Sequence, residues 1–65
     1  MQLIVNGRPM EAPENCILHD LLQRLEVSGR FAVEVNAEIV PRSRHARRRL
    51  QAGDRIEIVR AVGGG

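Results

Sequence analysis

Only one stretch of this chain has the apolar spacing of an amphipathic helix. Leu18, Leu21, Leu22 and Leu25 recur at intervals of three and four residues, which places them on one helical face. The other apolar runs alternate with polar residues at the period of two that is typical of β-strands. A chain of 65 residues with one such helix and several strands is therefore expected to cover one face of a sheet with that helix.

The ends of the helix have weaker signals than its apolar face. Asn15 is a good capping residue type, but no Glu or Gln stands three residues later to complete a capping box. Asp20 suits the positive end of the helix dipole. Gly29 can adopt the left-handed conformation that commonly follows a helix. We therefore expect the helix to lie between Asn15 and Gly29.

Two hairpins flank the helix in the sequence. Asn6-Gly7 is a strong two-residue turn signal between a first strand, "MQLIV", and a partner over about residues 8–12. Pro9 lacks a backbone N–H, which favours an edge position for this partner strand. Asn36-Ala37 predicts a second turn, between "FAVEV" and a short returning strand over residues 38–40 that ends at Pro41.

The last strand is predicted in "RIEIVR", after a turn in which Gly53 is the expected residue with positive φ. Ile56 and Ile58 should point inward, with Arg55 and Glu57 outward. The predicted fold is α+β: a β-grasp, in which a mixed sheet of four to five strands packs on one helix and the first and last strands are central. We expect a β-grasp domain over residues 1–60, followed by a flexible glycine tail over residues 61–65. The predicted core is Leu3, Val5, Leu18, Leu21, Leu22, Leu25, Val33, Val35, Ile39, Leu50, Ile56 and Ile58.

Composition and residue spacing argue against several classes of protein. The apolar runs are too short to span a membrane, and no signal-peptide pattern precedes the first strand. The single cysteine, Cys16, cannot form an internal disulfide. These features favour a cytoplasmic protein. Cys16, His19 and His45 lack metal-ligand spacing, and no nucleophile–base pattern or phosphate-binding loop is present, so we expect a protein that is not an enzyme.

The charge is distributed unevenly along the chain. Residues 1–40 hold three arginines and six acidic residues, whereas residues 41–65 hold seven arginines and two acidic residues. Clustered arginines are typical of a nucleic-acid surface, and a small β-grasp RNA-binding module is one alternative. No aromatic residues are interleaved for base stacking, so a solvated basic surface or steering toward an acidic partner is favoured instead. The cluster consists of Arg42, Arg44, Arg47, Arg48 and Arg49.

Several segments resemble the thiamine-pathway sulfur carriers (the ThiS family), which are small ubiquitin-like proteins. The matching segments are "MQLIVNG", "LHDLLQRL", "VEVNAEIVPR" and "LQAGDRIEIVRAVGG". The chain departs from the pattern at Ile17, where Thr often opens the helix, at Ala37, where Gly would be easier, and at His45, in a region where an aromatic is common. Its tail has three glycines, one more than the pattern needs. The resemblance implies a β-grasp fold and a role as a carrier.

The chemistry that the resemblance implies takes place at the C-terminus. An ATP-dependent adenylating enzyme activates the carboxylate of Gly65, and sulfur from a cysteine desulfurase or another donor converts it to a thiocarboxylate. Thiazole synthase then receives the sulfur. ATP and Mg²⁺ belong to the adenylating enzyme, so this chain is expected to bind no cofactor. Gly63 and Gly64 would thread the tail into the partner sites.

Physical reasoning supports such a role for the tail. A terminal carboxyl group is ionised at neutral pH and resists nucleophilic attack until it is activated. The five residues after Arg60 span roughly 16–18 Å when extended, and glycines make this segment thin. The exposed face of the last strand, with Arg55, Glu57 and Val59, is the expected docking surface. A molybdopterin-pathway sulfur carrier and a protein-conjugating modifier are further alternatives, since both share the Gly-Gly end.

Overall fold

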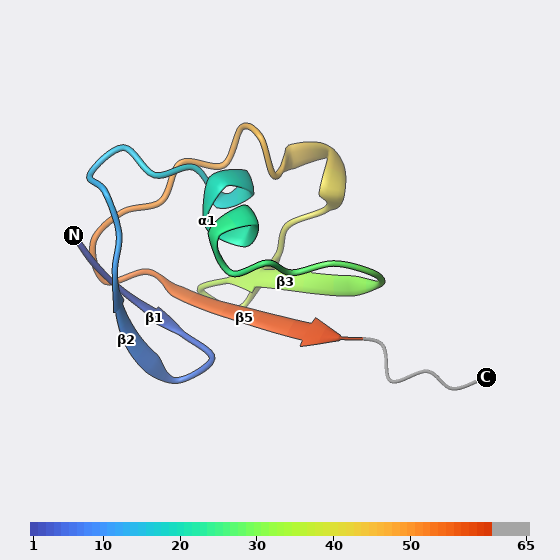
Figure 1. The fold of residues 1–65 in the computed structure, drawn as a ribbon, viewed down its shortest axis with the longest axis horizontal. Helices are drawn as coiled ribbons and strands as arrows, with labels where there is room; N and C mark the ends of the chain where they lie inside the picture. Colours follow the sequence, from blue (N-terminus) through green and yellow to red (C-terminus); the bar gives the residue numbers. More distant parts are fainter. Residues whose placement is uncertain (61–65) are drawn as a thin grey trace.

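Two hairpins and a final strand form one five-stranded sheet in the computed structural model, which describes residues 1–60 (Figure 1). The strand order is β2-β1-β5-β3-β4, with β1 and β5 parallel and the other neighbouring pairs antiparallel. The predicted mixed sheet, with the first and last strands inside it, is thus confirmed. The strands are β1 (Gln2–Val5), β2 (Arg8–Glu11), β3 (Phe31–Val35), β4 (Glu38–Ile39) and β5 (Arg55–Arg60).

Both predicted two-residue turns are present. Asn6 and Gly7 have φ values of 49° and 80°, and Asn36 and Ala37 have φ values of 52° and 70°. Two consecutive positive φ values are typical of the turn whose twist matches that of a hairpin. Pro9 lies on β2, which is an edge strand as predicted.

The helix, α1 (Leu18–Arg24), lies within the expected limits, but it begins without a side-chain cap, so Asn15 does not cap it. Ile17 occupies the N-cap position, and backbone carbonyls from a distant segment accept the first free N–H groups. The N–H of Leu18 donates to the carbonyl of Arg48 (2.9 Å), and that of His19 donates to the carbonyl of His45 (3.0 Å). The helix start is therefore satisfied by tertiary structure, which local capping patterns do not show.

The helix also ends earlier than the Gly29 signal indicates. Glu26, with φ of 55°, is the left-handed residue after the helix. Its N–H donates to the carbonyl of Gln23 (3.0 Å), and the N–H of Val27 donates to that of Leu22 (3.1 Å). This pair of bonds is the Schellman motif. Gly29 also has a positive φ, of 81°, but it lies in the loop that follows this motif.

The core lies between the sheet and α1, and most of the predicted core residues are buried in it. Ile39 is the exception, since its side chain is 73% exposed. It pairs with Glu34 on the outer face of the sheet, and Val40 is buried in its place, because adjacent strand residues point to opposite faces. Ala12 and Cys16 are further core residues that the periodicity did not indicate. The buried apolar residues are Leu3, Ala12, Cys16, Leu18, Leu21, Leu22, Val33, Val35, Val40, Leu50 and Ile56, with Val5, Leu25 and Ile58 partly buried against them.

The connection between β4 and β5 passes over the helix on the covered side of the sheet (Figure 1). It contains a short 3₁₀ helix, η1 (Arg42–Arg44). Within residues 1–60, no helix is long and apolar enough to cross a membrane. The opposite face of the sheet has no helix over it in this part of the chain, and this arrangement leaves the outer residues of β5 open.

Candidate functional site

The outer face of β5 contains the three residues predicted as a docking surface. Arg55 and Glu57 are exposed, and Val59 is 58% exposed. Ile56 and Ile58, which alternate with them, point toward the helix. β5 ends at Arg60, directly before the predicted tail in the sequence. The structure therefore brings these residues together on one face, next to the start of the tail.

Cross-strand neighbours extend this face over the sheet. Ala32 lies opposite Val59, and Glu34 lies between Glu57 on β5 and Ile39 on β4. Ile39 and Val59 are the two large apolar side chains that are most exposed within the described residues. Two carboxylates directly opposite each other destabilise a sheet. The pairing of Glu34 with Glu57 therefore lowers the stability of the isolated domain. We call the surface formed by Ala32, Glu34, Ile39, Arg55, Glu57 and Val59 the outer sheet face.

Turn side chains hold β5 in register. Asn6 Oδ1 accepts a hydrogen bond from the N–H of Ile58 (2.8 Å), and Asn36 Oδ1 accepts one from the N–H of Arg55 (3.0 Å). The two asparagines therefore support the central strand as well as their own turns. Sequence reasoning identified them only as turn residues, because the strand that they contact is distant in the sequence.

Asp54, which directly follows Gly53 in the turn before β5, is buried. Its Oδ1 accepts a hydrogen bond from Asn36 Nδ2 (3.0 Å), and its Oδ2 accepts one from the N–H of Gln51 (2.8 Å). Buried carboxylates are tolerated when their oxygens are hydrogen-bonded in this way. Asp54 thus connects the second hairpin to the turn that begins β5.

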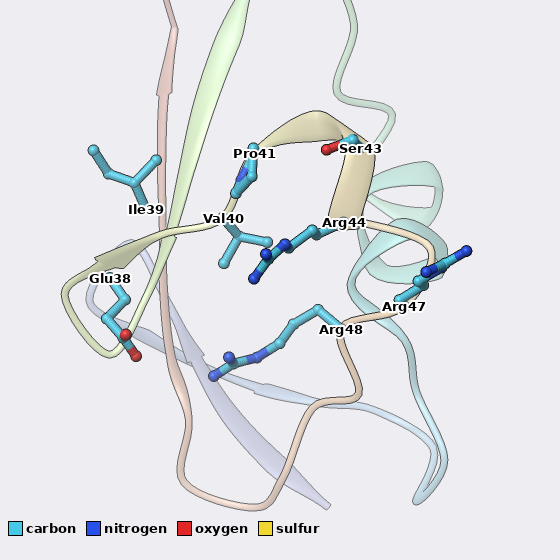
Figure 2. A pocket seen from close by; sticks show the side chains of 8 residues that line it. All are labelled: Glu38, Ile39, Val40, Pro41, Ser43, Arg44, Arg47 and Arg48. Carbon is cyan, nitrogen blue, oxygen red and sulfur yellow. The ribbon is translucent and has the colours of Figure 1, made fainter.

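The five clustered arginines of residues 42–49 have different surroundings in the structure. The guanidinium carbon of Arg42 lies 5.6 Å from the centre of the Phe31 ring, a cation–π arrangement. Arg44 and Arg48 point into a groove beside β4, whereas Arg47 points away from them (Figure 2). Arg49 is exposed, and its backbone forms a bridge to Ile17. Side-chain direction therefore separates residues that the sequence groups together.

His45 belongs to the core and not to this basic surface. Its ring stacks on that of Phe31, with 6.2 Å between the ring centres. His45 Nε2 lies 2.9 Å from the carbonyl oxygen of Val40, and because a carbonyl only accepts, Nε2 carries the hydrogen. The imidazole therefore packs in the core as a ring beside Phe31.

Cys16 is buried, with 4% of its surface exposed. Burial, followed by the negative charge of Asp20, raises the pKa of the Cys16 thiol, against a smaller opposing effect of Arg24. The thiol is therefore protonated at neutral pH, which disfavours nucleophilic chemistry. No group of three or more metal-ligating side chains occurs among residues 1–60. Gly63, Gly64 and Gly65, the predicted sulfur-carrying tail, lie outside the described residues.

Comparison with known proteins decides the family. The model of the ThiS family matches residues 3–65, which is nearly the whole chain. This chain belongs to the ThiS family. The family resemblance expected from "VNAEIVPR" and the glycines after β5 is thereby confirmed.

Individual relatives of this ThiS-family chain are similar over its whole length. The sulfur carrier protein ThiS of Escherichia coli (strain K12) is 32% identical over 66 residues, with all of both chains covered. The crystal structure of the thiamine biosynthesis protein ThiS from Geobacter metallireducens matches with a TM-score of 0.86 at 32% identity, again with all of both chains covered. This match confirms the β-grasp fold.

A further relative is a much longer protein. A thiazole synthase of Paramagnetospirillum magneticum (strain ATCC 700264 / AMB-1) is 41% identical over 66 residues. The match covers all of this ThiS-family chain, but the chain spans only 20% of the length of that protein. A sequence similar to the whole of this chain therefore occurs within a protein named thiazole synthase.

Proposed function

We propose that this chain is the sulfur carrier of thiamine biosynthesis and that it carries sulfur as a thiocarboxylate on Gly65. The observation that supports this most strongly is the match to the ThiS family over residues 3–65, which includes the glycine tail. In this proposal an adenylating enzyme uses ATP and Mg²⁺ to convert the Gly65 carboxylate to an acyl-adenylate. Pyrophosphate leaves in this step. The terminal sulfur of a persulfide on the cysteine desulfurase or another donor then attacks the acyl carbon and displaces AMP, and a thiol cleaves the resulting acyl disulfide to leave the thiocarboxylate and a disulfide.

The chain itself contributes no catalytic side chain in this proposal. Its buried thiol and its core histidine are directed inward, so they are poorly placed to act on a partner. The chain is a substrate whose reactive atoms are at its end, and catalytic groups and cofactors belong to the partners. Thiazole synthase is proposed as the sulfur acceptor, which the similarity to part of the Paramagnetospirillum magneticum protein supports.

The tail variants provide the test of this function. Replacement of Gly64 or of Gly65 by valine should abolish thiocarboxylate formation, because the added side chain widens the thin segment that must enter the partner site. Both variants should retain the unfolding temperature of the unaltered protein. Normal loading of either variant by the adenylating enzyme would contradict the assignment of Gly65 and Gly64.

The outer sheet face is proposed as the surface that docks on these partners. It combines exposed apolar side chains, Ile39 and Val59, with the opposed carboxylates of Glu34 and Glu57. A basic group of a partner placed between these carboxylates would relieve their repulsion. The proximity of β5 to the tail allows docking and threading to occur together.

Replacement of Val59 by aspartate tests the docking proposal. The substitution adds a buried charge to an apolar contact, so we expect the rate of loading at limiting partner concentration to fall by at least about tenfold. Gln23→Asp, on the exposed side of α1, is the control and should leave the rate within about twofold of the unaltered protein. Equal rates for both variants would exclude Val59 from the docking surface.

A further inference from the structure

A groove beside β4 contains two arginines that have no partner within the described chain. Its volume is about 700 Å³, a size typical of sites that accept a few side chains or a small ligand. One wall is formed by Ile39, Val40 and Pro41, and the other by the segment that starts at η1. Figure 2 shows Arg44 and Arg48 extending from that segment into the same space.

Arg48 is held in an unusual environment for its charge. Its Nε is buried, yet it has no hydrogen-bond acceptor among the residues that the structure describes. Buried donors are normally paired, and an unpaired one costs free energy. Glu38 also lines the groove, but no acidic side chain of residues 1–60 lies within ion-pair distance of Arg44 or Arg48. The guanidinium end of Arg48 lies in the groove (Figure 2), where an acceptor from outside this part of the chain can reach it.

The lining of the groove indicates the chemistry of its occupant. Arginines outnumber the single glutamate, so the groove favours an anion. Planar guanidinium groups suit carboxylates, which accept two parallel hydrogen bonds. The opposite wall is apolar and includes Val40 and Pro41, of which Pro41 is exposed. An occupant with both carboxylates and apolar side chains matches both walls.

We propose that this groove binds an acidic, partly apolar segment of a partner protein, with carboxylates on Arg44 and Arg48 and an apolar side chain against Val40 and Pro41. RNA is a poorer match, because the groove lining contains no aromatic residue on which a base could stack. The proposal does not rest on the sulfur-carrier function, since it concerns a binding surface formed by residues 38–48. The proposal assigns binding to Arg44 and Arg48 and not to the other arginines of residues 42–49.

An NMR titration with a blocked peptide of glutamate and leucine tests this proposal on the full chain. The side-chain Nε–H signals of Arg44 and Arg48 should shift as the peptide is added, and a peptide with glutamine in place of glutamate should cause no such shift. The variant Arg44→Gln/Arg48→Gln should bind the acidic peptide at least about tenfold more weakly, because two charged hydrogen-bond donors are removed. The matched control is Arg8→Gln/Arg49→Gln, which makes the same change in net charge at two exposed positions outside the groove.

These outcomes distinguish specific binding in the groove from non-specific attraction between opposite charges. Binding that is lost in the groove variant and kept in the control supports the proposal. Equal weakening in both variants, or no shift with the acidic peptide, would overturn it. A shift caused by a uridine oligonucleotide or inorganic phosphate but not by the peptide would also overturn it. Because Arg48 is half-buried, the single variant Arg44→Gln, at an exposed position, provides the same comparison if the double variant unfolds.

Discussion

At the scale of single residues, the two hairpin turns offer a direct comparison. Both begin with asparagine, which tolerates positive φ, but the second turn position is Gly7 in one and Ala37 in the other. Ala37 has a φ of 70°, where its Cβ is crowded by the backbone. A Cβ built at Gly7 would meet no atom within 4 Å. Backbone strain is therefore the main difference between the two positions.

We expect opposite effects from exchanging these two residue types. Ala37→Gly should raise the free energy of unfolding by about 0.5–1 kcal/mol, and Gly7→Ala should lower it by at least a similar amount. Urea denaturation of the two variants and the unaltered protein measures both changes. A loss of stability in Ala37→Gly would show that the strain at Ala37 is compensated elsewhere in the turn.

Cys16 should give the protein a distinctive dependence on alkaline pH. Its pKa is raised by burial and then by Asp20, so the folded thiol retains its proton to a higher pH than the unfolded thiol. As pH rises above about 8.5, the ordinary value for a thiol, only the unfolded state ionises at first. The free energy of unfolding should therefore fall as pH rises through this range.

The composition makes this pH effect easy to isolate. The chain has no lysine or tyrosine, so Cys16 is the side chain expected to titrate between about pH 8.5 and 11. Denaturation curves collected across this range should show the decline in the unaltered protein and a flatter profile in Cys16→Ala. An equally steep decline in Cys16→Ala would mean that another group causes it.

At the scale of helices and strands, the core assignment depends on which face each residue occupies. Leu22 lies on the buried face of α1, whereas Ile39 lies on the outer face of β4. Leu22→Ala should cost about 2–5 kcal/mol through lost burial and the cavity that remains. Ile39→Ala should change stability by less than about 0.5 kcal/mol. Thermal or urea unfolding measures both, and a comparable loss in the two variants would contradict the observed register of β4.

Whether an element could be predicted depends on whether the residues that determine it are close to it in the sequence. Both hairpins were predictable because Asn-Gly and Asn-Ala define their turns locally. The ends of α1 were not, because its first N–H groups bond to carbonyls of residues 45 and 48. The short strand β4 was placed correctly, but two ordered residues are too few to define which side faces inward. Ile39 and Val40 were therefore exchanged in the predicted core.

At the scale of the whole molecule, a single amphipathic helix leaves few ways to cover the apolar faces of the strands. This constraint made the β-grasp arrangement predictable, with β5 inside the sheet. The groove was not predictable, because the sequence shows only that five of the eight residues 42–49 are arginines. The path of the chain through η1 and the residues after it directs Arg44 and Arg48 toward β4. The buried carboxylate of Asp54 was missed for a similar reason, since its partner Asn36 is distant in the chain.

The central claim is that Gly65 carries sulfur, and the intact mass of the protein tests it most directly. The chain is incubated with the adenylating enzyme, ATP and a sulfur donor, and it is then weighed by mass spectrometry. The account predicts an increase equal to the difference between sulfur and oxygen, located on the C-terminal fragment and dependent on ATP. A mass that stays unchanged while the enzyme is shown to be active, or an increase located on Cys16, would contradict it.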